Sequence, residues 1–326
     1  MQGPAKIKLL TGGRDLRQSL GLEIGPREAP LIRREAGPIL YADYVDTETL
    51  RAGLHASLDP AALMEVDVVT GGGKLSAVMP RPVDYIVASH VVEHVPDLLG
   101  WLADLREVLK PGGTLGLAIP DRRFTFDRFR QESTIAEAVE AYLLQYDRPS
   151  VRQIFDCAWH AVTMEVSEGW RGGPDPAAAS AYRMGKLPAA LELVRGVHES
   201  GRYNEAHCWV FTPASFLDLC GQAAALSLFA YELADFHPTE SGGYEFYAVL
   251  RRMEPGGDAI GPIEKARKAM QGWPPEAEFA EAHLSDEVRT LRAENAALRE
   301  GMAVMRESTS WRITAPVRRL AARFRG

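Results

Sequence analysis

Short apolar runs alternate with turns and helical stretches along the first 120 residues, and this alternation constrains the fold more than any other feature of the chain. The runs lie at 21–24, 39–42, 64–68, 85–88 and 115–119. Runs of this length are typical of strands buried on both faces of a sheet, and the intervening helices connect such strands in parallel. We therefore expect an α/β fold with a doubly wound, mostly parallel sheet.

The clearest helix signal lies between residues 97 and 110. Asp97 is a typical N-cap residue, and the sequence Pro111-Gly112-Gly113 follows as a stop signal. The apolar residues between them recur at the three- and four-residue spacing of a helix face, at Leu98, Trp101, Leu102, Leu105 and Leu109. This spacing predicts a helix between the fourth and fifth strands.

Residues 122–205 lack strand signals and contain helical periodicity at 135–146 and 187–198, which predicts a helical insertion. Two later apolar runs, at 226–233 and 244–250, enclose a polar turn with two glycines. This pattern predicts an antiparallel pair that closes the sheet, so the first domain is expected to span residues 1–252.

The C-terminal part follows a different pattern. Residues 253–283 are rich in proline, glycine and charge, which is typical of a linker. From Leu284 the apolar residues follow a four-three spacing over about three heptads, which predicts a C-terminal coiled-coil helix over 284–308. Asn295 occupies a core position of this seam and favours an in-register partner, so we expect a homo-oligomer through 284–305. A single helix folded back onto the domain is the alternative.

The last segment, 309–326, carries five arginines and no acidic residue, interspersed with large apolar side chains. A basic amphipathic segment of this kind can lie on an anionic membrane surface. A partner-binding helix or a frayed terminus are the alternatives.

Composition excludes some classes and places the chain in the cytoplasm. The formal net charge is −7, which argues against a general nucleic-acid binder, because phosphate contacts need clustered Lys and Arg. The three cysteines have no metal or redox spacing and fit a reducing compartment. Neither a signal-peptide core nor an apolar stretch of about 18 residues is found in the sequence. We expect a cytoplasmic protein, with peripheral contact at the inner membrane as an extension.

Two strand ends carry residues suited to a nucleoside ligand. Gly25 follows the first strand, where a glycine lets the backbone approach a ligand at the carboxyl edge of a parallel sheet. Asp43 follows the second strand about twenty residues later, where a carboxylate can accept both hydroxyls of a ribose. Each signal is weak alone, and together they favour a nucleoside site.

The segment 83–95, VDYIVASHVVEHV, is followed by the helix and then by LKPGGTL at 109–115. With LEIGP at 22–26, this order resembles the class I S-adenosylmethionine-dependent methyltransferases of the small-molecule branch, closely over 18–121 and more loosely over 207–252. The resemblance implies a Rossmann-like fold and S-adenosylmethionine as cofactor. The implied cofactor-binding residues are Glu23, Gly25, Asp43, Asp67 at the adenine edge, Ser89 and His90.

The chain departs from that family in the loop after the first strand. The family pattern has three alternating glycines, whereas here Pro26 and Arg27 follow Gly25 directly. The loop is therefore either a modified cofactor site or one that has lost binding. We expect binding to be retained, because Glu23 and Asp43 keep their places.

The run from His90 to His94 also matches the HxxEH pattern of zinc proteases. That pattern binds metal on a helix, where the two histidines face the same ion. Here a strand leads into the run and Pro96 ends it, so we expect neither a metalloprotease nor a metal site.

Two residues are candidates for the proton transfer that methylation of an acceptor requires. Asp121 follows the fifth strand, and histidine is the residue type most often used for proton transfer, so Asp121 and His207 are candidate general bases. A helix cap for Asp121 and a structural role for His207 are the alternatives. Charged residues between Arg122 and Arg130 are candidates for binding an anionic acceptor.

The sequence SWRITAPVRR at 310–319 resembles segments that follow coiled coils in bacterial surface-polysaccharide enzymes, notably glycosyltransferases. The hypothesis is therefore a methyltransferase for a hydroxyl of a sugar or glycolipid, with a glycan or other small-molecule acceptor and contact to a glycosyltransferase through 309–326. The alternatives are a catalytically silent scaffold that tethers glycosyltransferases, and a methyltransferase for an unrelated metabolite.

Overall fold

The computed structural model describes residues 3–53, 59, 62–172 and 179–270. The chain divides into two compact units, Met1–Trp273 and Pro274–Gly326, and the described residues all belong to the first. The predicted coiled coil at 284–308, the tail at 309–326 and the linker beyond residue 270 lie outside the described residues.

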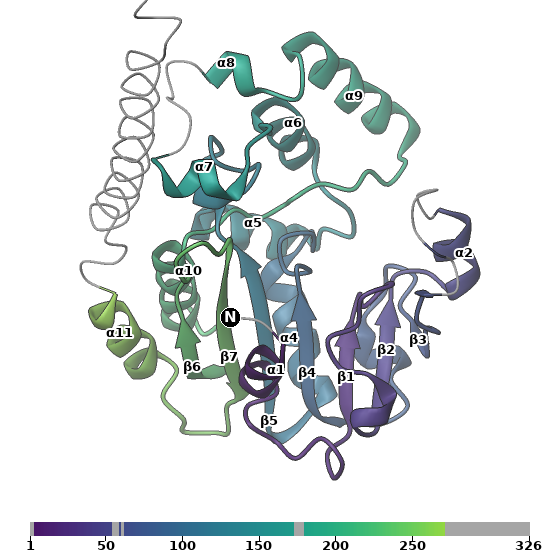
Figure 1. Cartoon of the computed structure of the whole chain (residues 1–326), viewed down its shortest axis with the longest axis vertical. Helices are drawn as coiled ribbons and strands as arrows, with labels where there is room; N and C mark the ends of the chain where they lie inside the picture. Colours follow the sequence, from purple (N-terminus) through teal and green to yellow (C-terminus); the bar gives the residue numbers. More distant parts are fainter. Residues whose placement is uncertain (1–2, 54–58, 60–61, 173–178, 271–326) are drawn as a thin grey trace, which may run out of the picture. The chain divides into compact units, whose positions relative to one another are not determined.

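Within the described residues the chain forms a seven-stranded sheet in the order β3-β2-β1-β4-β5-β7-β6 (Figure 1). Strands β1 to β5 are parallel, and β7 is antiparallel to both of its neighbours. The strands span Gly21–Ile24 (β1), Ile39–Asp43 (β2), Val68–Val69 (β3), Val83–Ser89 (β4), Leu109–Pro120 (β5), Tyr231–His237 (β6) and Glu245–Arg252 (β7). This arrangement confirms the predicted doubly wound, mostly parallel sheet.

Strand β3 is shorter and begins later than the predicted run at 64–68. Only Val68 and Val69 pair with β2, because the backbone groups of residues 64 and 65 form hydrogen bonds with other segments. The backbone N–H of Met64 donates to Arg27 O, and the Arg34 guanidinium donates to Glu65 O. These contacts hold residues 64 and 65 away from the ladder.

Strand β5 begins earlier than predicted, directly after helix α4 (Leu98–Val108), whose N-cap is Asp97 as expected. The Pro111-Gly112-Gly113 stop signal lies within β5. The pairing of β5 with β4 shifts register between Val83 and Tyr85 of β4. The stop signal thus follows the end of the helix and forms part of the next strand.

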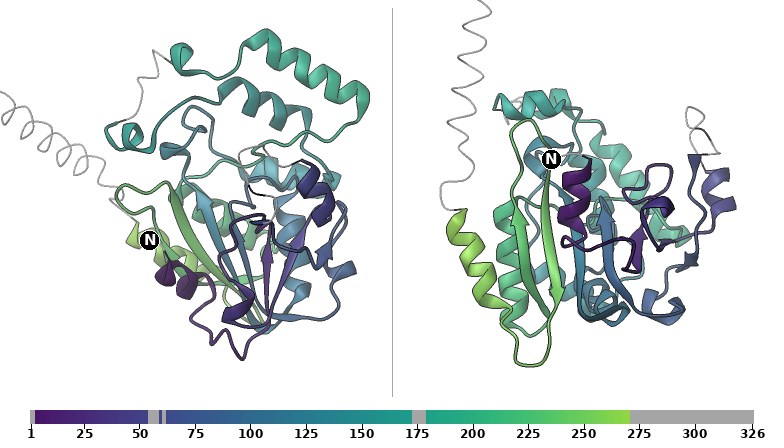
Figure 2. Two further views of the ribbon diagram at one scale, coloured as in Figure 1. Left: turned by 45° about the vertical axis from the view of Figure 1, so that its right-hand side comes forward. Right: turned by 60° about the horizontal axis from the view of Figure 1, so that its bottom comes forward.

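Helices cover both faces of the sheet (Figures 1 and 2). One face packs against α4 and α10 (Pro213–Ala225), with Leu102 and Leu217 in its core. The other face packs against α1 (Pro4–Leu10), with Leu10 in a second core. A Cβ atom at Gly116 of β5 would lie 2.0 Å from Leu10 O, so only glycine allows α1 to approach this closely.

The insertion is helical, as predicted: its first helix packs beside α4 on one face of the sheet, and the later helices lie beyond the carboxyl ends of the strands (Figures 1 and 2). The two expected helices, α5 (Ile135–Leu144) and α9 (Leu187–Ser200), are present, and three others accompany them in the described residues. These are α6 (Val151–His160), α7 (Val166–Trp170) and α8 (Ala179–Tyr182). Ser150 and Gln153 form a capping box at the start of α6, a signal present in the sequence.

The antiparallel pair is also present, but β6 begins after the predicted start at 226 because α10 continues to Ala225. Helix α11 (Ile260–Ala269) follows β7 and buries Ile263 in the core beside α10. Residues 260–269 therefore belong to the first unit, and the prediction of a linker from residue 253 is wrong there.

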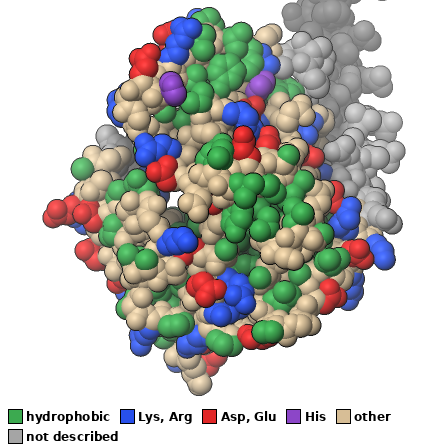
Figure 3. Space-filling model, turned by 180° about the vertical axis from the view of Figure 1, so that it is seen from behind, with side chains coloured by type: hydrophobic (Ala, Val, Ile, Leu, Met, Phe, Trp, Pro, Cys, Tyr) green, Lys and Arg blue, Asp and Glu red, His purple; other side chains and the backbone are tan. Residues whose placement is uncertain are grey.

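Figure 3 shows the face opposite to that of Figure 1, where hydrophobic side chains gather between scattered acidic and basic ones. The two signs of charge are interspersed over the described part of this face. No helix in the described ranges is long and apolar enough to cross a bilayer.

Candidate active site

The strand order reverses at β1, between β2 and β4, and this switch point is where open α/β sheets bind ligands. Gly25 directly follows β1 and has a left-handed φ of 65°. Its N–H donates to Ala42 O, so it lies beside the end of β2. A Cβ atom at Gly25 would be 3.3 Å from a methyl of Val91, so the loop requires glycine for backbone and space.

The loop after Gly25 is held by Glu23. The two carboxylate oxygens of this buried residue accept hydrogen bonds from the N–H groups of Leu31 and Ile32, at 2.7 and 3.0 Å. Burial raises the pKa of Glu23, and these hydrogen bonds oppose that effect. Pro26 is buried, and Arg27 is exposed with a φ of 48°. Glu23 thus shapes the loop.

Asp43 lies at the carboxyl end of β2, half-buried, next to Gly25. Burial raises the pKa of its carboxyl group, and hydrogen bonds from the backbone of Tyr44 and Val45 lower it. The Tyr44 ring stacks on Tyr203, with centroids 5.5 Å apart. A left-handed glycine beside a half-buried carboxylate at the switch point fits the ribose side of an adenosyl cofactor.

Asp67 does not lie where the adenine-edge prediction requires. It precedes β3, and its carboxylate accepts hydrogen bonds from Tyr41 N and the Arg34 guanidinium, both at 2.8 Å. The prediction is wrong because the strand begins at Val68, so the residue after it is Thr70.

Ser89 ends β4, half-buried, and His90 follows with a φ of 54°. The His90 Nε2 atom lies 2.8 Å from Glu245 Oε2, and Lys6 pairs with the same carboxylate. Burial alone would lower the pKa of His90, but the hydrogen bond to Glu245 and the nearby negative charge of Glu93 raise it to about 9. His90 is therefore a cation near neutral pH, held by its acidic neighbours.

Asp121 is fully buried, and its carboxylate is already bound. Its oxygens accept hydrogen bonds from the Arg123 guanidinium at 2.6–3.2 Å and from the Thr239 hydroxyl at 2.7 Å. It also caps the short helix η3 (Arg122–Phe124). Because these donors occupy the carboxylate, the structure favours the cap alternative over a general-base role for Asp121.

His207 lies on the segment before α10, buried, with its Nδ1 atom 2.5 Å from Asp127 Oδ2. Arg130 binds both partners, through Asp127 Oδ1 and through His207 O, each at 2.8 Å. Burial would raise the pKa of Asp127, but His207 and Arg130 hold it below its usual range. Asp127 is thus an anion that orients the imidazole.

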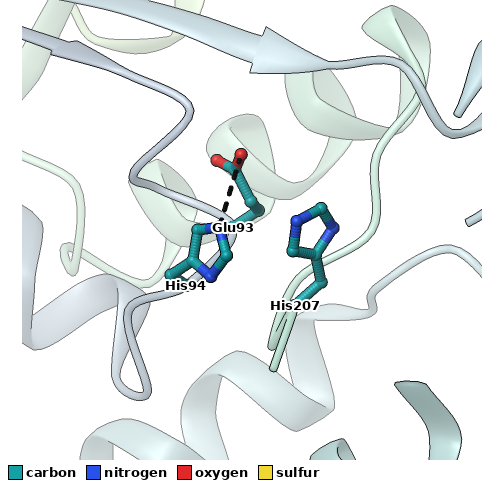
Figure 4. Close-up of side chains that lie close together, drawn as sticks. All are labelled: Glu93, His94 and His207. Carbon is teal, nitrogen blue, oxygen red and sulfur yellow. Dashed lines mark ion pairs between the residues drawn. The ribbon is translucent and has the colours of Figure 1, made fainter. Parts of the chain in front are cut away.

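Glu93 and His94, on the turn after β4, lie beside His207 (Figure 4). One ligand atom from each of the three residues lies within 4.8 Å of the other two. The His94 and His207 rings meet edge to face, with centroids 4.6 Å apart. Burial lowers the pKa of His94, and His207 lowers it further. We call Glu93, His94 and His207 the histidine–glutamate cluster.

The backbone brings the two halves of this cluster together. The N–H groups of Cys208 and Trp209 donate to Glu93 O, and the Trp209 indole donates to Val95 O at 2.6 Å. Glu93 and His94 were not predicted as site residues. Their HxxEH pattern was visible in the sequence, but the partner that completes the cluster is the distant His207, and the run forms a turn.

A cavity of 670 Å³ lies beside the cluster, between α5, α6, α9 and residues 208–210. Its lining includes Arg130, Arg152, Asp156 and Cys208. Arg130 connects this lining to the His207–Asp127 pair. The cavity therefore adjoins the cluster through Arg130 and Cys208, and none of the three cluster side chains is part of its lining.

Comparisons with solved structures give weak similarities. The chain is similar to an S-adenosylmethionine-dependent methyltransferase from Mesorhizobium loti, at 13% identity and a TM-score of 0.38 over 76% of this chain and 96% of that one. For a methyltransferase from Methanosarcina mazei the identity is 14% and the TM-score 0.36, over 77% and 98% of the two chains. It spans half the length of the CurJ carbon methyltransferase chain, at 12% identity and a TM-score of 0.35 over 74% of this chain.

No curated protein matches the sequence. A family model described as a methyltransferase domain matches residues 22–226, which is more than half of the chain. That range includes Gly25, Asp43 and the whole histidine–glutamate cluster. The chain therefore belongs to this methyltransferase domain family.

Proposed function

We propose that this methyltransferase transfers the methyl group of S-adenosylmethionine to a hydroxyl of a sugar or glycolipid. The observation that carries the proposal is the His207–Asp127 pair, which lies with Glu93 and His94 beside the carboxyl end of β4. S-adenosylmethionine supplies an electrophilic methyl group. The protein must bind it, align the acceptor and manage one proton.

Gly25 and Asp43 are the proposed cofactor-binding residues, with Ser89 and His90 on the next strand end. The half-buried Asp43 carboxylate would accept hydrogen bonds from the ribose hydroxyls, because it lies beside the left-handed Gly25. Glu23 acts indirectly, by fixing the loop through Leu31 and Ile32.

An aliphatic hydroxyl ionises far above neutral pH, so the acceptor needs a group that withdraws its proton. Asp127 accepts a hydrogen bond from Nδ1–H of His207, which leaves Nε2 as the atom that acts on the hydroxyl. The adjacent cavity has room for a sugar, and the half-exposed Arg152 guanidinium in its lining would bind a sugar oxygen or an attached anionic group. Arg130, by contrast, is held by Asp127, Asp156 and His207 O.

The test combines calorimetry with a transfer assay using radiolabelled S-adenosylmethionine. The acceptors are nucleotide sugars, lipid-linked sugars and, for comparison, phenols. We expect saturable cofactor binding and label in the sugar fraction, lost in His207→Ala without loss of cofactor binding. Label only in phenols would replace the sugar proposal by methylation of an unrelated metabolite.

A role in surface-polysaccharide assembly is proposed from the C-terminal sequence alone. Oligomerisation through 284–305 and contact of 309–326 with a membrane or a glycosyltransferase belong to the same proposal. Pro26, buried directly after Gly25, favours one further candidate, a silent scaffold. Undetectable cofactor binding by the wild type would support the scaffold.

A further inference from the structure

We propose that Glu93, His94 and His207 bind a divalent transition-metal ion of the zinc class. The three side chains offer two imidazole nitrogens and one carboxylate oxygen, within 4.8 Å of one another (Figure 4). Two histidines and one glutamate form a recurrent zinc ligand set that leaves a coordination position open for substrate or water.

Glu93 provides the independent observation. Its side chain is 1% exposed, and neither carboxylate oxygen has a hydrogen-bond partner among the described residues. The nearest cationic nitrogen is His90 Nδ1, 3.5 Å from Oε1, which is beyond good hydrogen-bond geometry. The His90 cation compensates Glu93 only in part, because its other ring nitrogen pairs with Glu245 at 2.8 Å. A buried anion is costly unless its charge is balanced, and a metal ion at the cluster would supply the remaining positive charge.

The second observation is the orientation of His207. Metal-bound histidines usually donate their other ring N–H to a carboxylate, which fixes the tautomer and strengthens the ligand. Asp127 takes this role at Nδ1, and Arg130 fixes Asp127 in turn. The Nε2 atom of His207 is therefore the ligand atom, and Asp127 is a positioning residue.

The ligand atoms of the cluster lie farther apart than those of an occupied metal site. Ligand atoms about 2.1 Å from a tetrahedral ion lie about 3.4 Å apart, so the three atoms must draw together on binding. His94 is the residue free to move, because its side chain is 30% exposed and its contacts to Glu93 and Glu205 are 4.0 and 3.5 Å long. The Glu205 carboxylate adds negative charge beside the site.

The inference deepens the proposed function and rests on it only for what the metal does. With an ion in place, the acceptor hydroxyl would occupy the open position, where a metal lowers the pKa of a bound oxygen. Its O–H bond would break, the proton would leave to solvent, and the oxygen would keep the electron pair that forms the new bond to the methyl carbon. The bond between that carbon and the sulfonium sulfur would break at the same time, with its electron pair left on the sulfur of the departing S-adenosylhomocysteine. His207 would then act on the hydroxyl through the metal.

The experiment uses the full chain, stripped with a chelator and titrated with Zn²⁺ in a calorimeter, without S-adenosylmethionine. Co²⁺ absorption in the visible range reports the coordination geometry in parallel. We expect one site per chain and an intense tetrahedral cobalt spectrum. Asp127→Asn should weaken binding about 10- to 100-fold, and Glu93→Gln and His94→Ala should weaken it further.

His198→Ala is the matched control, because His198 is an exposed histidine on α9 and is not one of the three cluster residues. It should bind metal like the wild type. Circular dichroism checks that each variant is folded. Equal metal binding by the wild type, Glu93→Gln and His94→Ala, or no saturable binding by the wild type, would overturn the site. Either result leaves methyl transfer untouched, whereas metal binding without any transfer would contradict only the proposed function.

Discussion

Nδ1 of His207 lies 2.5 Å from Oδ2 of Asp127, across 80 residues of sequence. The contact joins the segment before α10 to the start of the insertion, and Arg130 completes it by binding Asp127 and His207 O. Because the turn after β4 also binds this segment through Glu93 O, three distant parts of the chain meet at one imidazole.

The first prediction concerns this imidazole. His207→Ala should lower kcat by about 10²- to 10⁴-fold, the usual contribution of a positioned proton-transfer group. Asp127→Asn should lower it less and shift the pH profile, because the orienting anion is lost. Steady-state kinetics at saturating cofactor, with His198→Ala as control, check both. Wild-type kcat in His207→Ala would remove the residue from the mechanism.

Asp43 should act on cofactor affinity. Asp43→Asn removes a charged acceptor whose hydrogen bonds contribute about 1.5–3 kcal/mol, which corresponds to an increase of about 10- to 150-fold in the Kd. Calorimetric titration with S-adenosylhomocysteine measures the effect. An unchanged Kd would show that the ribose is bound elsewhere.

Gly25→Ala should lower both the Tm and the affinity for cofactor. The left-handed backbone disfavours alanine by about 1–2 kcal/mol, and the new methyl would meet Val91 at 3.3 Å. Gly112→Ala is the matched control, since its φ is 68° and nothing lies within 4 Å of its Cβ position. Both variants should lose stability, but only Gly25→Ala should weaken cofactor binding. Equal affinities in the two variants would contradict the placement of the loop.

The His90–Glu245 pair predicts a dependence of stability on pH. Burial would raise the pKa of Glu245, but His90 and Lys6 lower it to about 2, while the pKa of His90 rises to about 9. The contribution of the pair to the stability of the fold is therefore lost as pH falls from about 4.5 towards 2, and also as pH rises from about 6.5 towards 9. Tm measured against pH should fall less in Glu245→Gln than in the wild type over 6.5–9. Parallel curves would contradict the pairing.

Asp121 should matter for folding. Asp121→Ala leaves the buried Arg123 guanidinium without its carboxylate, which should lower the free energy of unfolding by about 3–5 kcal/mol. Chemical denaturation measures this loss. A stable variant with lost activity would instead restore the general-base prediction.

The alternation of apolar runs was enough to predict the sheet, because buried parallel strands and helix caps are encoded in neighbouring residues of the sequence. Asp97, the N-cap of α4, is an example. Asp67 was misplaced because Arg34, Tyr41 and the loop of Arg27 decide where β3 begins, and these contacts are not local. His207 was predicted as a base from its residue type. Its cluster with Glu93 and His94 could not be predicted from spacing, since it depends on the backbone contact between Cys208 and Glu93.

Calorimetric titration of the full chain with S-adenosylmethionine is the deciding measurement, because methyl transfer at the cluster requires a methyl donor bound at the β1–β4 switch point. We expect the wild type to bind one cofactor per chain with saturation. Binding should be weaker in Asp43→Asn and unchanged in His207→Ala. No saturable binding by the wild type, with the fold intact by circular dichroism, would contradict methyl transfer at the cluster.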